Sequence, residues 1–142
     1  MNNEQQHTTM EYTMYFDGCS KGNPGEAGAG AVIYQNETEI WSSSVYVGAK
    51  ETNNVAEYTG MILGLTEAVA RNIKNISVKG DSMLVIKQMR GEYKVNSSNL
   101  KDLFARSKRL VSQFDTIAFT HVYRDMNKRA DTLSNDGVLM RC

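Results

Sequence analysis

Hydrophobic and polar residues alternate along the first part of the chain in a pattern that predicts three β-strands. The predicted strands are residues 11–16, 28–34 and 39–47, and a polar turn at residues 35–38 separates the second from the third. Short connections join neighbouring antiparallel strands, so an antiparallel meander is expected. A loop of Gly, Asn and Pro follows the first strand, and residues 48–52 are expected to end the third.

Helical and extended patterns are interspersed along the rest of the chain. Apolar residues recur at helical spacing from Val55 to Val69, with Asn53 and Asn54 as candidate N-caps. Strands are predicted at residues 76–81 and 115–122, and helices at residues 82–89, along the apolar face from Leu100 to Phe114, and at residues 127–137. The order β-β-β-α-β-α-α-β-α predicts an α/β fold. Its sheet is five-stranded and mixed, with three antiparallel strands and then two parallel ones, and helices flank it. Strands that follow helices are expected to be parallel neighbours of the first strand.

The length of 142 residues predicts one domain, residues 11–138, between a disordered tail at residues 1–10 and a short tail at residues 139–142. The apolar runs are too short to cross a bilayer and the first ten residues are polar, so we expect no membrane association and a cytoplasmic location. Two cysteines far apart, Cys19 and Cys142, predict neither a disulfide framework nor a zinc site.

Charge is distributed unevenly, although the net charge is zero. Residues 1–60 hold eight acids and two bases, whereas residues 87–109 hold seven bases and two acids. An acidic half beside a basic segment is compatible with a metal ion and a nucleic acid on one surface. A solvated helix face explains the basic segment equally well.

Four acidic residues lie at the ends of predicted elements. Asp17 and Asp81 follow strands, and Glu57 and Asp131 lie in the first turns of helices. The side chain of Asp17 is expected to meet solvent, beside Asp81 if their strands are parallel neighbours. Each acid alone has an ordinary explanation: Asp81 as a helix cap, Glu57 in a capping box with Asn54, and Asp131 as a helix-dipole acid. These explanations do not account for four acids at ends that one topology brings together.

Clustered carboxylates repel one another unless a cation lies between them. Ligands that are all oxygen favour Mg²⁺ or Mn²⁺ over zinc, and two such ions about 3.5–4 Å apart support phosphodiester cleavage. The glycines after Asp17 allow main-chain N–H groups to approach a phosphate.

Four sequence blocks carry a family resemblance. They read YFDGCSKGNPG at residues 15–25, TNNVAEY at 52–58, KGDS at 79–82 and HVYRDMNKRADTLSN at 121–135. In this order and at these spacings they resemble type 1 ribonuclease H (ribonuclease HI), and the match extends over about residues 11–137. The resemblance implies a ribonuclease H-like fold and an endonuclease that cuts the RNA strand of an RNA–DNA hybrid, leaving 5′-phosphate and 3′-hydroxyl ends.

The resemblance also implies roles for individual residues. The four acids match the family's catalytic carboxylates, which bind two Mg²⁺ ions, with Mn²⁺ as an alternative. Positions that match contacts to sugar and phosphate are Gly18, Cys19, Ser20, Gly22, Asn23, Asn53 and Asn54. Positions that match the DNA side are Thr52, Asn54, Ser97 and Ser98 for a phosphate and Tyr93 for stacking.

The chain departs from the family pattern in the loop after the last strand. Bacterial members often carry a flexible histidine there, whereas this loop reads YRDM at residues 123–126 and leaves Arg124 as the candidate substitute near the phosphate. His121 is predicted on the strand, as a packed residue. We expect neither the basic insertion before the long helix nor an N-terminal hybrid-binding domain, so the chain resembles the compact form of the family. Cys19 is a candidate site of oxidation.

Other functions fit parts of the pattern. A DNA nuclease of related fold shares the carboxylates but not the surrounding glycine and asparagine motifs. A hybrid-binding module without turnover would not need all four acids. A free-standing monomer is expected, with a homodimer and an origin in a longer polyprotein as the alternatives.

Overall fold

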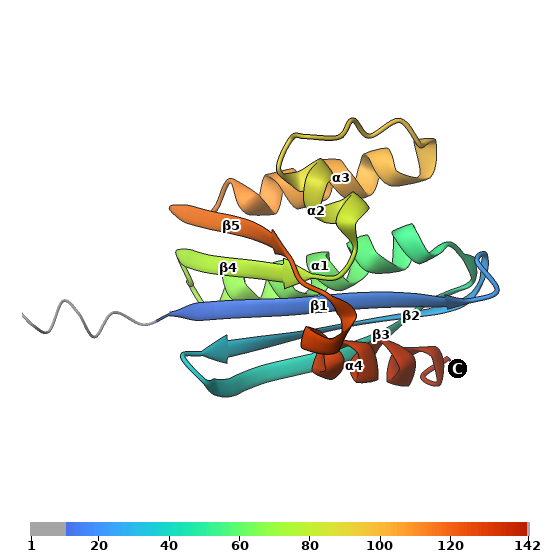
Figure 1. Ribbon diagram of the computed structural model, residues 1–142, viewed down its shortest axis with the longest axis horizontal. Helices are drawn as coiled ribbons and strands as arrows, with labels where there is room; N and C mark the ends of the chain where they lie inside the picture. Colours follow the sequence, from blue (N-terminus) through green and yellow to red (C-terminus); the bar gives the residue numbers. More distant parts are fainter. Residues whose placement is uncertain (1–10, 142) are drawn as a thin grey trace, which may run out of the picture.

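The computed structural model describes residues 11–141, which form a five-stranded sheet with helices on both faces (Figure 1). The strands are β1 (Tyr12–Lys21), β2 (Gly25–Gln35), β3 (Thr38–Glu51), β4 (Asn75–Gly80) and β5 (Thr116–His121). The helices are α1 (Asn53–Ala70), α2 (Met83–Met89), α3 (Ser98–Val111) and α4 (Lys128–Val138), with a 3₁₀ turn η2 (Arg124–Met126) before α4. The tail predicted at residues 1–10 lies outside the described residues. No helix within residues 11–141 is long and apolar enough to cross a membrane.

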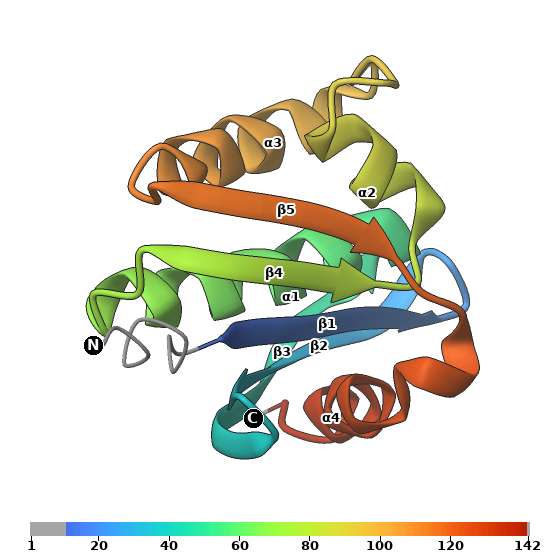
Figure 2. The same ribbon diagram turned by 60° about the vertical axis from the view of Figure 1, so that its left-hand side comes forward.

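The sheet has the strand order β3-β2-β1-β4-β5. β1 and β3 pair with β2 in antiparallel fashion, and β4 pairs in parallel with both β1 and β5. The predicted element order and mixed sheet are therefore confirmed. The expectation that both later strands lie beside the first was wrong for β5, because β4 occupies that edge of β1 and β5 extends the sheet outward (Figure 2).

The first three strands are longer than predicted. β1 continues to Lys21 and β3 to Glu51, because the antiparallel ladders extend as far as the pairs Lys21–Glu26 and Gly25–Glu51. The predicted loop thus shrinks to residues 22–24, where Gly22 has a φ of 128° that side chains rarely adopt. Backbone pairing between strands outweighs the weak strand propensity of this glycine-rich segment.

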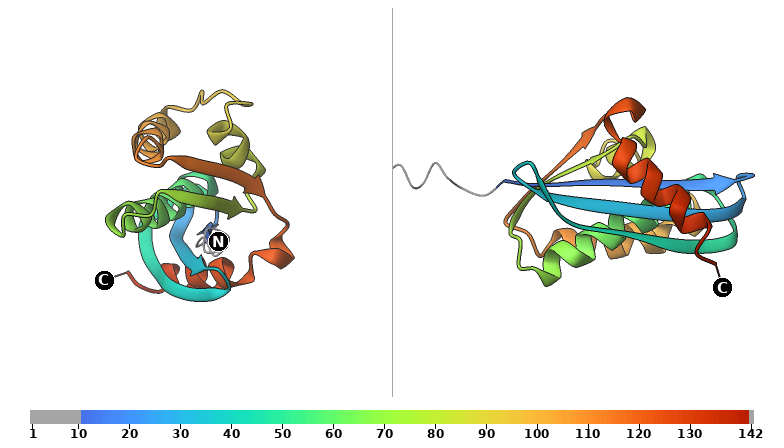
Figure 3. Two further views of the ribbon diagram at one scale, coloured as in Figure 1. Left: turned by 90° about the vertical axis from the view of Figure 1, so that its left-hand side faces the viewer. Right: turned by 90° about the horizontal axis from the view of Figure 1, so that it is seen from below.

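Two helices approach the sheet closely from opposite faces. On one face, a Cβ atom on Gly60 of α1 would lie 2.5 Å from the Asp17 carbonyl oxygen. The other face is covered by α4 (Figure 3), and Cβ atoms on Gly28 and Gly30 of β2 would collide with this helix. Residues of opposite parity along β2 face opposite sides, so α1 packs over Ala31 while α4 lies over Gly30. Helices from both faces therefore reach the central strand β1.

The main hydrophobic core lies on the α1 face. It joins β1, β2 and β4 to helices α1, α2 and α3, and includes Met14, Phe16, Tyr58, Leu65, Val78, Ile86 and Leu100. A polar chain crosses this core, since Tyr58 donates to Gln88 (2.7 Å) and the Gln88 amide donates to the Lys94 carbonyl (3.1 Å). This chain links α1 to the connection between α2 and α3, residues 90–97.

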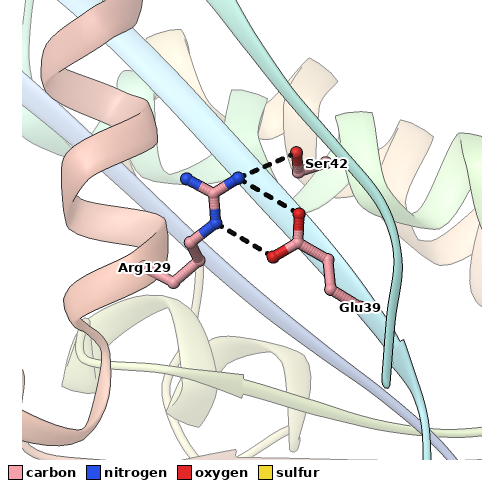
Figure 4. Close-up of polar contacts among 3 residues, drawn as sticks. All are labelled: Glu39, Ser42 and Arg129. Atoms are coloured by element: carbon pink, nitrogen blue, oxygen red, sulfur yellow. Dashed lines mark hydrogen bonds and ion pairs between the residues drawn. The ribbon is translucent and has the colours of Figure 1, made fainter. Parts of the chain in front are cut away.

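Ion pairs attach α4 to the neighbouring strands. The guanidinium of Arg129 donates to both carboxylate oxygens of Glu39 on β3, at 3.0 and 3.1 Å, and to the Ser42 hydroxyl (Figure 4). Beyond the far end of the helix, Arg141 pairs with Glu26 at 2.8 Å. Such exposed pairs contribute little stability individually.

Replacing Gly18 with Ala tests the closest contact between β1 and α1. A Cβ atom there would lie 2.2–2.4 Å from backbone atoms of Ala56 and Glu57, which cannot move independently of the helix. We expect Gly18→Ala to lower the free energy of unfolding by about 3 kcal/mol, measured by urea denaturation. Gly48→Ala is the matched control, because its closest neighbour is the Glu51 side chain, which can rotate away. Equal losses in the two variants would contradict this account of the packing.

Candidate metal and nucleic-acid site

The four acidic residues converge where the ladder between β1 and β4 ends. Its last pair is Phe16 with Gly80, so Asp17 and Asp81 are the next residues on two adjacent parallel strands. Beyond this pair, β1 continues against β2 while the chain of β4 turns into α2. The side of β1 that faced β4 thus opens at Asp17, and side chains from both faces of the sheet can meet there.

Three carboxylates form the centre of the site. Ligand oxygens of Asp17, Glu57 and Asp81 all lie within 4.8 Å of one another. Asp17 and Glu57 are only 4% and 8% exposed. The expectation that Asp17 meets solvent was therefore wrong, because β1 runs on past it and both α1 and α4 cover it.

The donor set fits a divalent cation. Oε1 of Glu57 is buried without a hydrogen-bond partner among the described residues, and such an atom is costly unless something charged or polar satisfies it. Three carboxylates around one point offer the all-oxygen ligands that Mg²⁺ and Mn²⁺ prefer.

Asp131 lies at the edge of this group rather than at its centre. It stands in the first turn of α4 and lines the same cleft, of about 300 Å³, as the other three acids. It is not among the three acids whose oxygens lie within 4.8 Å of one another. The structure thus gathers all four predicted acids in one cleft, three of them tightly.

Burial and mutual repulsion shift the pKa values of the inner pair. Burial, and then the charge of Asp81, raises the pKa of Asp17 from 3.8 to about 7, while a hydrogen bond from Ser134 opposes the rise. Burial, and then the charges of Asp17 and Asp81, raises the pKa of Glu57 well above its ordinary value. A cation bound between these groups would stabilise their ionised forms and so oppose the rise in both pKa values.

The capping roles considered for two of the acids belong to other residues. Thr52 caps α1 by accepting the Val55 N–H at 3.2 Å, so neither Asn53 nor Asn54 is the N-cap as predicted. Ser82 caps α2 in the same way through the Val85 N–H. A capping box for Glu57 and a capping role for Asp81 are therefore excluded. Asp131 does occupy the favourable first turn of its helix.

The predicted sugar- and phosphate-binding residues brace one another beside the acids. Oδ1 of Asn53 accepts the Ser20 N–H (2.8 Å), and Oδ1 of Asn23 accepts the Asn53 N–H (2.9 Å). The Ser20 hydroxyl donates to the Glu51 carbonyl and accepts the Asn23 N–H. These bonds tie the turn after β1 to the start of α1. Gly18, Cys19, Asn53, Asn54 and Arg124 line the acidic cleft.

Three residues predicted for the DNA side, Tyr93, Ser97 and Ser98, lie outside the lining of the cleft, whereas Asn54 belongs to it. Tyr93 is 46% exposed in the 90–97 connection, with the Lys87 ammonium 5.2 Å from its ring centre. Ser97 and Ser98 are exposed at the start of α3. The buried chain from Tyr58 through Gln88 to Lys94 holds this connection in place.

Sequence reasoning missed several residues of the site. His121 was expected to be packed, yet it is only half-buried and lines the cleft with Tyr123, whose ring it contacts edge-on at 5.3 Å. His121, the last residue of β5, pairs with Gly80, the last residue of β4. The rule that residues at the carboxyl ends of parallel strands lie close together identified Asp81, and it applies to His121 as well. Asn127 and Ser134 were missed as well. Asn127 binds β1 from the N-cap of α4, and Ser134 binds it from within the helix. The pattern of hydrophobic and polar residues along the sequence does not distinguish such buried polar residues from exposed ones.

Comparison with known proteins agrees with the site. A family model described as reverse transcriptase-like matches residues 15–137. The bifunctional protein Rv2228c of Mycobacterium tuberculosis is 41% identical over 91% of this chain, which spans only 36% of that relative's length. Ribonuclease HI of Halobacterium salinarum is 38% identical over 87% of this chain and 62% of its own length. Ribonuclease H of Pseudomonas syringae is 32% identical over 88% of this chain and 90% of its own length.

Solved structures extend the similarity to three dimensions. The N-terminal ribonuclease H domain of Rv2228c superposes with a TM-score of 0.87 at 40% identity, covering 92% of this chain and 94% of that one. LC11 ribonuclease H1, solved in complex with an RNA/DNA hybrid, gives a TM-score of 0.84 at 34% identity, covering 90% of this chain and 96% of that one. Sheet order, acidic cleft and superposition together define a ribonuclease H fold. The chain belongs to the reverse transcriptase-like family and, within it, to the type 1 ribonucleases H.

The shifted pKa values predict how metal-free protein responds to pH. A carboxyl group with a raised pKa keeps its proton in the folded state after the unfolded state has lost it, so stability falls as pH rises from about 4 to about 7. For Asp17 the loss is up to about 4 kcal/mol at about 1.36 kcal/mol per pKa unit. Urea denaturation in EDTA at pH 5 and pH 8 measures the part of this loss that falls above pH 5, about 3 kcal/mol for the two pKa units between pH 5 and pH 7. Asp17→Asn should flatten the dependence, and Mg²⁺ should stabilise the wild type more at pH 8. Equal stability at both pH values in EDTA would contradict the account.

Proposed function

We propose that this protein is an endoribonuclease that hydrolyses the RNA strand of RNA–DNA hybrids, leaving 5′-phosphate and 3′-hydroxyl ends. One observation carries the proposal: three carboxylates meet within 4.8 Å, and a buried Glu57 oxygen lacks any protein partner among the described residues. Similarity to ribonucleases H along most of the chain, including one solved with a hybrid, supports the same substrate.

In this proposal Asp17, Glu57, Asp81 and Asp131 hold two Mg²⁺ ions, with Mn²⁺ as an alternative. The ions supply an activated water and stabilise the leaving oxygen of the phosphodiester. The chain's own contribution is a rigid set of carboxylates, since Asp17 and Glu57 are buried on packed elements. The low exposure of these groups also keeps bulk water from competing for the same oxygens.

The turn after β1 is suited to reading the RNA strand. Gly18 and Cys19 line the acidic cleft, and Ser20, Gly22, Asn23 and Asn53 form the braced segment next to it. Polar side chains and small residues in this position bring donors and acceptors to a ribose 2′-hydroxyl, the group that distinguishes RNA from DNA. Arg124 also lines the cleft and offers a cation to the phosphate.

The DNA strand would lie across α1, the 90–97 connection and the start of α3. The hydroxyl of Thr52 accepts the helix cap bond and keeps its own proton for a phosphate, joined by Asn54, Ser97 and Ser98. Exposed Tyr93 provides a stacking surface. Lys87, Arg90, Lys94 and Lys101 add positive charge in the same region. A cytoplasmic location and a monomeric state, with a homodimer as the alternative, belong to the same proposal.

Cleavage of a labelled hybrid tests the proposal directly. In Mg²⁺ the RNA strand should be cut, while duplex DNA stays intact. Asp17→Asn should reduce the rate of cleavage by at least about 1,000-fold, because it removes one of the carboxylates that hold the proposed metal ions. Asp102→Asn, on exposed α3, should cleave like the wild type. A hybrid left intact in both Mg²⁺ and Mn²⁺ would refute the proposal. Cleavage of duplex DNA would favour a DNA nuclease, and tight hybrid binding without any cutting would favour a binding module.

Tyr93 tests the DNA side separately. Tyr93→Ala should raise the KM for the hybrid by about tenfold and leave kcat nearly unchanged, because one stacked base contributes about 1–3 kcal/mol and the ring lies outside the acidic cleft. Tyr93→Phe keeps the ring and should behave like the wild type. Steady-state kinetics on one hybrid substrate measures both constants. A fall in kcat with an unchanged KM would assign Tyr93 another role.

A further inference from the structure

Ser134 lies between the two elements that carry Asp17 and Asp131. It is fully buried on α4, and its hydroxyl is 3.0 Å from Oδ2 of Asp17 and 2.9 Å from the carbonyl oxygen of Asp131. A hydroxyl has one proton to donate, so the two acceptors share it. Ser134 thus contacts β1 and the first turn of α4 through a single oxygen atom.

The bond to Oδ2 restricts the carboxylate of Asp17. A carboxylate held at one oxygen cannot rotate freely about its terminal torsion, so the direction of the other oxygen is set as well. The side chain at the N-cap position of α4 secures the backbone next to it. Asn127, which is 1% exposed, donates from its amide to the Phe16 carbonyl at 2.9 Å. The helix therefore holds Asp17 both at the preceding peptide and at the carboxylate itself.

Asp131 is tied to the same arrangement. Its N–H donates to the Asn127 carbonyl at 3.0 Å, and its carbonyl accepts from both Ser134 and Asn135. A shift of α4 relative to β1 would therefore disturb the bonds at Asp17 and move Asp131 at the same time.

We infer that Ser134 is a positioning residue that orients the Asp17 carboxylate toward a bound divalent cation and fixes its position relative to Asp131. The inference rests on the proposed function for its metal ions, but not on cleavage of any substrate. Donors that orient metal-binding side chains typically contribute 10–100-fold to metal affinity.

The test is Mn²⁺ binding by the full chain without nucleic acid, measured by isothermal titration calorimetry. Ser134→Ala removes the hydroxyl and adds no bulk, and we expect Mn²⁺ affinity to fall about tenfold. Ser107→Ala is the matched control. Ser107 is also a fully buried helical serine whose hydroxyl donates to a backbone carbonyl, that of Leu103 at 2.8 Å, but it lies on α3, away from the cleft. The control should bind Mn²⁺ like the wild type.

A second measurement separates positioning from loss of folding. Thermal unfolding in EDTA should show similar small losses for the two serine variants, while added Mn²⁺ should raise the melting temperature less for Ser134→Ala. Wild-type affinity in Ser134→Ala, equal weakening in both variants, or a wild type that binds no Mn²⁺ would each overturn the inference. A wild type that binds Mn²⁺ but cuts no hybrid would refute the proposed function alone.

Discussion

Repulsion among buried carboxylates is the constraint on which this structure depends. Asp17 and Glu57 are nearly inaccessible to water, and their oxygens lie within 4.8 Å of each other and of Asp81. Without a cation, burial and neighbouring charge raise the pKa of both inner groups, so their ionised forms are unfavourable. Packing elsewhere must therefore be strong enough to hold the acids together. The core shared by β1, β4, α1 and α2 supplies that packing.

Unequal strand lengths create the place where the acids meet. β4 ends opposite Phe16 while β1 continues against β2, so the sheet is open on one side of Asp17. Glu57 reaches this opening from α1 on one face, and Asp131 lies on α4 on the other. The same opening admits His121 from the end of β5. A site assembled in this way combines a rigid strand with side chains from four other elements.

Much of this arrangement could be predicted from the sequence, because strand ends and helix starts are local signals. Asp17, Asp81, Glu57 and Asp131 were predicted in this way, and the fold followed from the order of the elements. The burial of Asp17 could not be predicted, since it depends on the pairing of β1 with glycine-rich β2 beyond the predicted strand end. The role of Ser134 depends on the angle at which α4 crosses β1, which no local pattern records.

The contact of Gly18 with the backbone of Ala56 and Glu57 also bears on the spacing of two of the proposed metal ligands. Two peptide backbones that touch cannot approach further, and here the core keeps them from separating, so the spacing of Asp17 and Glu57 is nearly fixed. Mg²⁺ binds oxygen at about 2.1 Å in strict octahedral geometry, whereas Ca²⁺ needs about 2.4 Å and more ligands. In the proposed metal site, a frame that does not expand would favour the smaller ion, so the missing side chain of one glycine would act as a filter for ion size.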